Sequence, residues 1–112
     1  MAPPSDLRKQ TQVLQRLVKE VAFHRKDLKT QEERVAKLKA NPDDENAEFM
    51  LKQQRQAIEE TKRVIPAVQE KVTQAIEDLE SLLENNKGED ASVEVTDAEQ
   101  AIKDAKEAVG GA

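Results

Sequence analysis

The sequence contains no cysteine, tryptophan or tyrosine, and among its 112 residues it has only one histidine, two phenylalanines and three glycines. The lack of cysteine excludes a disulfide framework, a cysteine-based zinc site and a thiol nucleophile. Because His24 stands alone with scattered carboxylates, a zinc site is not expected. A histidine at this position is more typical of a hydrogen-bonded residue between helices. Three glycines, two of them in the C-terminal tail, do not form a glycine-rich phosphate loop.

Long apolar runs are also missing. The opening residues, from Met1 to Asp6, are polar, and no stretch of 18 apolar residues follows. The sequence therefore predicts neither a signal peptide nor a transmembrane helix, and we expect a soluble intracellular protein. Charged residues make up 37% of the chain and give a net charge of -5. A chain of this length is long enough for one domain and not for two.

Aliphatic residues recur with a heptad period in two long segments, about residues 5–39 and 44–86. A strand would need a period of two, which is absent. Pro42 and the Asn and Asp residues around it separate the two segments, because proline disfavours helix at the preceding residue and Asn or Asp caps the next helix. The a and d positions are Leu7, Gln10, Leu14, Leu17, Val21, His24, Leu28, Gln31, Val35 and Leu38 in the first segment, and Leu51, Gln54, Ile58, Thr61, Ile65, Val68, Val72, Ala75, Leu79 and Leu82 in the second.

The apolar stripe is wider than a and d alone, because Val13, Val18, Ala57, Val64, Ile76 and Leu83 flank it. A two-stranded coiled coil needs only a and d, so the extra width predicts a third helix. Gly88 suits the end of the second helix, and Thr96 with Glu99 forms a capping-box pattern before a third segment, about residues 96–109. The predicted fold is all-α: an elongated antiparallel three-helix bundle with coiled-coil-like packing. The apolar flanks could equally form the contact of a homodimer instead of being covered by the third helix.

Pro66 interrupts the helical pattern of the second segment. It removes one backbone hydrogen bond and crowds the carbonyl of Lys62, which predicts a kink at this point. A tolerated bend explains it, and a bend that shapes a binding surface is the alternative.

Charge is distributed unevenly along the chain. Residues 1–41 carry ten Lys/Arg against five Asp/Glu, whereas residues 42–86 carry five against eleven and residues 87–112 three against seven. Two interpretations stay open: the basic first helix attracts the acidic helices, or its outer face recognises an acidic partner. The negative net charge and the lack of Tyr and Trp argue against nucleic acid, and no segment suits a membrane surface.

No constellation of residues suits catalysis. Carboxylate pairs such as Glu32-Glu33 and Glu59-Glu60 are adjacent in sequence, and adjacent residues on a helix diverge by about 100°, so they do not converge on a substrate. We therefore predict that the protein is not an enzyme. Phe23 and Phe49 fall at outward-facing heptad positions, where an aromatic side chain is a candidate interface anchor.

Several short motifs resemble the tubulin-specific chaperone A family, also called tubulin-binding cofactor A, in a fungal-like form. They are Gln15-Arg16-Leu17-Val18-Lys19-Glu20, Gln31 to Leu38, Leu51-Lys52-Gln53-Gln54, and Glu60 to Pro66 with its mid-helix proline, followed by Asp78-Leu79-Glu80 and Leu83-Glu84. The first departs from the family pattern at Gln15, where lysine is usual. The resemblance runs from about residue 5 to 109.

This resemblance implies a cytoplasmic, cytoskeleton-associated three-helix bundle that holds quasi-native β-tubulin after chaperonin release, before other folding cofactors join it to α-tubulin. It implies no ATP, metal or other cofactor. Because tubulin is acidic, the basic first helix is the candidate contact. A structural coiled-coil tether or dimerisation module without a specific client is the alternative function. The candidate partner-binding residues are Arg16, Lys19, Glu20, Phe23, Glu32, Glu33, Arg34, Lys62, Arg63 and Pro66.

Overall fold

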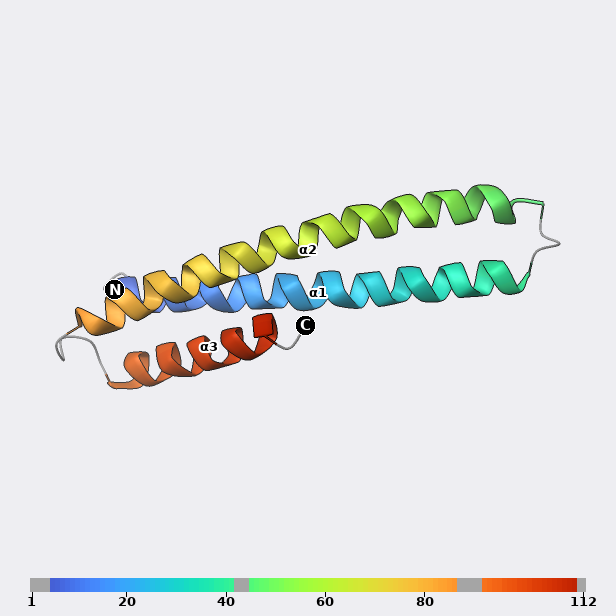
Figure 1. Cartoon of the computed structure of the whole chain (residues 1–112). Coiled ribbons are helices and arrows are strands. Elements are labelled where there is room, and N and C mark those ends of the chain that lie inside the picture. The colour runs from blue at the N-terminus through green and yellow to red at the C-terminus, as the bar shows by residue number, and fades with distance from the viewer. Residues whose placement is uncertain (1–4, 42–44, 87–91, 111–112) are drawn as a thin grey trace. The chain divides into compact units, whose positions relative to one another are not determined.

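Three α-helices make up the computed structural model, which describes residues 5–41, 45–86 and 92–110. They are α1 (Asp6–Ala40), α2 (Ala47–Glu84) and α3 (Ser92–Gly110), and Figure 1 shows their order along the chain. No strand occurs in these three stretches, so the all-α prediction is confirmed. The roles predicted for Pro42 and Gly88 as helix breakers fall outside the described residues.

The start of α3 differs from the prediction. The helix begins at Ser92, so Thr96 lies in its second turn and the capping-box prediction is wrong. A tertiary contact favours the earlier start, because the Ser5 hydroxyl donates a hydrogen bond of 2.7 Å to a carboxylate oxygen of Glu94 in the first turn of α3. Local capping propensity is weak beside such packing contacts.

The chain folds into two compact units. The first comprises Met1–Val21 and Val68–Ala112 and contains all of α3 with parts of α1 and α2; we call it the three-helix unit. The second comprises Ala22–Ala67 and contains the rest of α1 and α2; we call it the two-helix unit. The prediction of a single domain stays a prediction.

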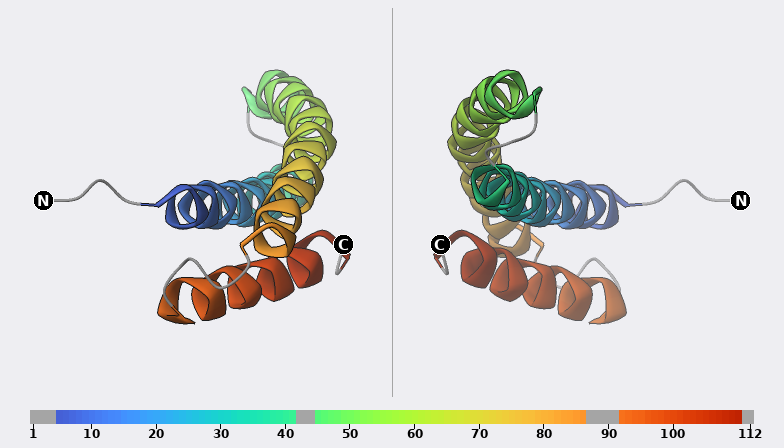
Figure 2. Two further views of the ribbon diagram at one scale, coloured as in Figure 1. Left: turned by 90° about the vertical axis from the view of Figure 1, so that its left-hand side faces the viewer. Right: turned by 90° about the vertical axis from the view of Figure 1, so that its right-hand side faces the viewer.

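The hydrophobic core lies in the three-helix unit. Both views of Figure 2 show α3 beside the N-terminal part of α1 and the C-terminal part of α2. The large, fully buried side chains come from heptad a positions of α1 and α2, and α3 contributes mainly alanines, which permit close helix approach. The core residues are Leu7, Leu14, Val21, Val68, Val72, Ala75, Ile76, Leu79, Ala98, Ala101, Ile102 and Ala105. The predicted third helix therefore covers the widened stripe in this unit, including Ile76.

Polar contacts fix the ends and sides of the three-helix unit. The Ser5 hydroxyl also accepts a 3.1 Å hydrogen bond from the backbone N–H of Arg8, which makes Ser5 the N-cap of α1. Lys106 of α3 forms a 3.1 Å ion pair with Glu80 of α2. Both of these side chains are about half exposed, so the pair contributes at most about 1 kcal/mol. The Ser5 side chain contacts the first turns of both α1 and α3, so it is a more specific contact than the Lys106–Glu80 ion pair.

The two-helix unit is an antiparallel pair with a thinner and more polar seam. Its a and d side chains, among them Leu28, Ile58 and Ile65, are only partly buried. The buried side chains here are Gln31, Ala47 and Thr61. The Thr61 hydroxyl donates to the carbonyl of Ala57 one turn earlier, at 2.9 Å, and so is satisfied within its own helix. Aliphatic burial in this unit is incomplete because only two helices contribute to it.

Pro66 lies inside α2 and is exposed to solvent. Residues 47–84 form one continuous α-helix across it. Proline has no N–H to donate to the Lys62 carbonyl, so one helical hydrogen bond is missing for chemical reasons. The predicted kink stays a prediction.

Replacing Leu79 by alanine should lower the free energy of unfolding by about 2–5 kcal/mol, because Leu79 is fully buried among three helices. Ile65→Ala should cost less, at or below about 2 kcal/mol, because Ile65 is only partly buried. Denaturant unfolding followed by circular dichroism measures both. Losses under about 0.5 kcal/mol at both sites would contradict the heptad register.

Pro66→Ala should raise the free energy of unfolding, by up to about 3 kcal/mol, because it restores a helical N–H donor at an exposed position. The same unfolding experiment measures the gain. If the variant is no more stable than the unmodified protein, the helix around Pro66 is adapted to the absence of this hydrogen bond.

Candidate partner-binding surfaces

The side chains predicted to bind a partner all lie at the surface. Each of them is exposed, as expected for positions chosen on the outer faces of the helices. They are Arg16, Lys19, Glu20, Phe23, Glu32, Glu33, Arg34, Lys62, Arg63 and Pro66. Exposure makes these residues available for contact, and their role in binding stays a prediction.

Three of these residues, Arg16, Lys19 and Glu20, belong to the three-helix unit. Lys19 lines a shallow hollow of about 310 Å³ together with Gln15 and Val18 of α1 and Ala101 and Asp104 of α3. The outer face of α1 is therefore bordered by α3 at Lys19.

Phe23 is the most exposed of the aromatic anchors proposed from the sequence. Its side chain is 64% exposed, and its ring packs edge-on against His24, with 5.6 Å between ring centroids. His24 itself is half-buried at a d position, as the heptad pattern predicts. The contact holds the phenylalanine ring against the helix and leaves most of its surface open.

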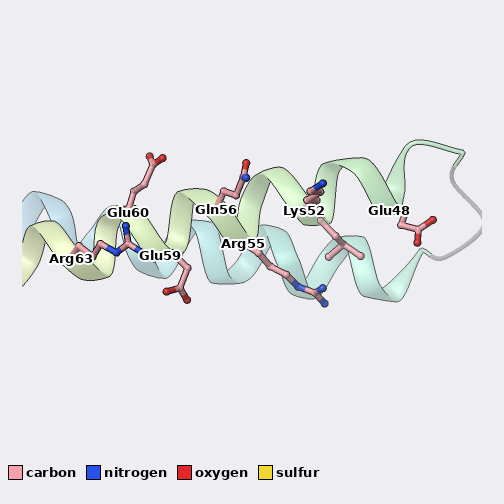
Figure 3. A pocket seen from close by; sticks show the side chains of 8 residues that line it. Glu48, Lys52, Arg55, Gln56, Glu59, Glu60 and Arg63 are labelled. Atoms are coloured by element: carbon pink, nitrogen blue, oxygen red, sulfur yellow. The ribbon is translucent and has the colours of Figure 1, made fainter.

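A charged groove of about 740 Å³ runs along α2 in the two-helix unit. Figure 3 shows that its long side chains project from successive turns, with Lys52, Gln56 and Glu60 on one side and Arg55 and Glu59 on the other. Opposite charges stand four residues apart at Glu48 and Lys52 and along Arg55, Glu59 and Arg63, a spacing that lets neighbouring charges compensate one another. The lining residues are Glu48, Leu51, Lys52, Arg55, Gln56, Glu59, Glu60 and Arg63. Of these, only Arg63 is among the contacts predicted from the sequence.

Exposed apolar side chains gather in the two-helix unit. Of the five large ones among the described residues, four belong to it: Phe23, Phe49 at 63%, Met50 at 42% and Val64 at 38%. The fifth, Val93 at 69%, is in the three-helix unit. The outward positions that the heptad pattern predicts for Phe23 and Phe49 are therefore confirmed. The widened stripe also predicts that a third helix covers Val64, and in the two-helix unit none does.

Two amide groups weaken the seam of the two-helix unit. Gln31 is 8% exposed; its side-chain N–H lies 3.4 Å from a carboxylate oxygen of Asp27, a long hydrogen bond. The amide oxygens of Gln31 and Gln54 are buried and find no hydrogen-bond partner among the described residues. A buried acceptor without a partner costs about 1–3 kcal/mol. This part of the seam is therefore less stable than an aliphatic one.

The described stretches contain no candidate metal centre. No group of three or more His, Asp or Glu side chains is placed to hold a metal ion there. The helices in the same stretches include none that is long and apolar enough to cross a bilayer. The hollows are open surface grooves, lined largely by charged and polar side chains. Such surfaces suit a macromolecular partner.

The sequence and the fold both match one group of known proteins. The family described as tubulin binding cofactor A matches residues 2–109. Tubulin-specific chaperone A of Saccharomyces cerevisiae is 37% identical over 105 residues, which cover 93% of each chain. The human protein of that name is 34% identical over 96 residues, 86% of each chain.

Two solved structures share the fold. Rbl2p, described as a β-tubulin binding post-chaperonin cofactor, superposes with a TM-score of 0.81 at 35% identity, over 95% of this chain and 99% of its own. Tubulin folding cofactor A from Arabidopsis thaliana gives a TM-score of 0.78 at 26% identity, over 91% and 94%.

Gln31→Leu should raise the free energy of unfolding by about 1 kcal/mol, because it removes a buried unpaired oxygen and adds apolar surface at a d position. Gln53→Leu is the matched control, since Gln53 is exposed in the same unit and its replacement should change stability by less than about 0.5 kcal/mol. Denaturant unfolding compares the two. Equal effects would show that the Gln31 oxygen carries no burial penalty.

Proposed function

Because the chain belongs to the tubulin binding cofactor A family, we propose that it binds β-tubulin and holds it in a quasi-native state after chaperonin release, before the αβ heterodimer forms. The observation that carries this proposal is the match along nearly the full length of both chains to a β-tubulin binding post-chaperonin cofactor. The family is named for binding and not for a reaction, in agreement with the prediction that the protein is not an enzyme.

The outer face of α1 is our proposed contact for this acidic client. Support comes from the net charge of +5 over residues 1–41 and from the exposure of Arg16, Lys19, Phe23 and Arg34. Charge complementarity of this kind mainly raises the association rate, and it weakens as salt shortens the screening length below about 8 Å. Glu20, Glu32, Glu33, Lys62, Arg63 and Pro66 are further proposed contacts, all exposed.

The remaining assignments follow from the proposed role. A protein that holds β-tubulin for heterodimer assembly acts in the cytoplasm beside the cytoskeleton and hands its client to other tubulin-folding cofactors. A homodimer is a further proposal, supported by the exposed apolar flank of α2 at Met50 and Val64.

A structural tether or dimerisation module is the competing function, favoured by the heptad pattern alone. A pull-down from cell lysate separates the two. A tubulin chaperone captures β-tubulin in preference to the αβ dimer, whereas a tether captures neither. Failure to retain β-tubulin would overturn the proposed function.

Reversing two charges, Arg16→Glu with Lys19→Glu, should slow capture of β-tubulin and reduce the salt dependence of the association rate. Both side chains are exposed, so the helical circular dichroism and melting temperature should stay nearly unchanged. Stopped-flow or biosensor kinetics at several salt concentrations measure the effect.

The matched control reverses Lys71 and Lys103, exposed cations on α2 and α3 of the same unit. Capture by this control should stay near that of the unmodified protein. Equal rates for both double variants would move the contact away from the outer face of α1.

A further inference from the structure

Polar side chains are concentrated at the a and d positions of the two-helix unit. Of the ten a and d residues that α1 and α2 contribute to each unit, four are polar in the two-helix unit and one is polar in the three-helix unit. The four are His24, Gln31, Gln54 and Thr61, and the one is Gln10. The same two helices therefore meet through a polar seam in one unit and an aliphatic seam in the other.

Apolar burial differs in the same direction. The other six a and d side chains of the two-helix unit are aliphatic and only half-buried: Leu28, Val35, Leu38, Leu51, Ile58 and Ile65. Among the described residues, every member of the hydrophobic core belongs to the three-helix unit. Because helices in proteins are stabilised mainly by packing of their apolar faces, the two-helix unit holds its helices together more weakly. The core of the three-helix unit includes none of its side chains.

Opening of the two-helix unit relieves a penalty that its closed form carries. The amide oxygens of Gln31 and Gln54 are buried and have no hydrogen-bond partner among the described residues. When the two helices separate, water can donate a hydrogen bond to each oxygen. The free-energy difference between the closed and open forms is therefore smaller than it would be with an aliphatic seam.

Pro66 limits how far such an opening spreads along α2. It is the last residue but one of the two-helix unit, and it has no N–H to donate to the Lys62 carbonyl. Cooperativity along a helix depends on consecutive hydrogen bonds, so the missing bond separates the turns before Pro66 from those after it. The hydrophobic core includes Val68, two residues further on. The gap in the backbone hydrogen bonds thus lies beside the edge of the core.

We propose that the two-helix unit opens and recloses as one cooperative unit in the native protein, while the three-helix unit stays folded. Proteins open in such contiguous units, and those with few buried apolar contacts open most readily. Seven of the ten proposed partner contacts lie within residues 22–67, so the opening separates the two helices that carry them. The inference itself does not rest on the proposed function and is tested without β-tubulin.

Native-state hydrogen exchange at low denaturant tests the opening in the unmodified protein. Amides of residues 24–36 and 52–65 should exchange at least about tenfold faster than those of residues 69–80. Their exchange should also depend less steeply on denaturant, because opening of one unit exposes less surface than global unfolding. One shared rate with one shared denaturant slope for all three segments would mean that only global unfolding occurs, and would overturn the inference.

Two valine-to-alanine variants at heptad a positions form a matched pair. Val72 is fully buried in the three-helix unit, and Val35 is half-buried in the two-helix unit. Val72→Ala should speed exchange over residues 69–80 by about tenfold or more and change it over residues 24–36 and 52–65 by less than about twofold, because the core stays folded when the two-helix unit opens. Val35→Ala should speed exchange in all three segments, since the closed unit is part of the native state.

The Val72→Ala result decides between the two kinds of opening. If this variant speeds exchange in both units by the same factor, the two-helix unit opens only when the whole chain unfolds, and the inference is wrong. If either variant fails to fold, the exchange rates and denaturant slopes of the unmodified protein decide the question alone. The proposed function is unaffected by either result.

Discussion

The length mismatch between α3 and its partners is the constraint on which the rest of the structure depends. α3 has 19 residues, whereas α1 and α2 have 35 and 38. At 1.5 Å per residue, α3 spans about 28 Å and α2 about 57 Å, so α3 cannot cover the whole seam of the long pair. Full aliphatic burial is therefore confined to the part that α3 reaches, and every large, fully buried side chain among the described residues lies in that part.

In the part of the α1–α2 pair that α3 does not cover, the sequence places polar residues in the seam. That seam contains Gln31, Gln54 and Thr61 at d positions, and its flanks carry both acidic and basic side chains. A two-helix pair with an all-aliphatic seam would expose a large apolar area and risk nonspecific association. Polar d positions limit that risk, and they lower local stability in return.

The heptad pattern predicted most of the fold because burial follows it closely. The twenty a and d residues assigned from the sequence are all at least partly buried in the structure. The start of α3 was missed because a contact between Ser5 and Glu94, far apart in the sequence, decides it. The exposure of Val64 was not predicted. A widened apolar stripe indicates that a third surface covers it, but it does not indicate which molecule supplies that surface. Outward positions such as Phe23 were predictable; the groove along α2 was not, since it depends on how side chains of successive turns project.

The two units also differ in whether their residues are contiguous in the sequence, and this difference affects folding during synthesis. The two-helix unit is one continuous segment, Ala22–Ala67, whereas the three-helix unit combines residues that precede this segment with residues that follow it. A ribosome therefore synthesises the whole two-helix unit before it adds Val72, Leu79 or Ile102. Until then the first turns of α1 have no complete core to enter, because their partners are not yet synthesised. These turns must stay unpaired or pair transiently until α3 emerges. The last helix to be synthesised therefore completes a core whose first residues belong to the start of α1.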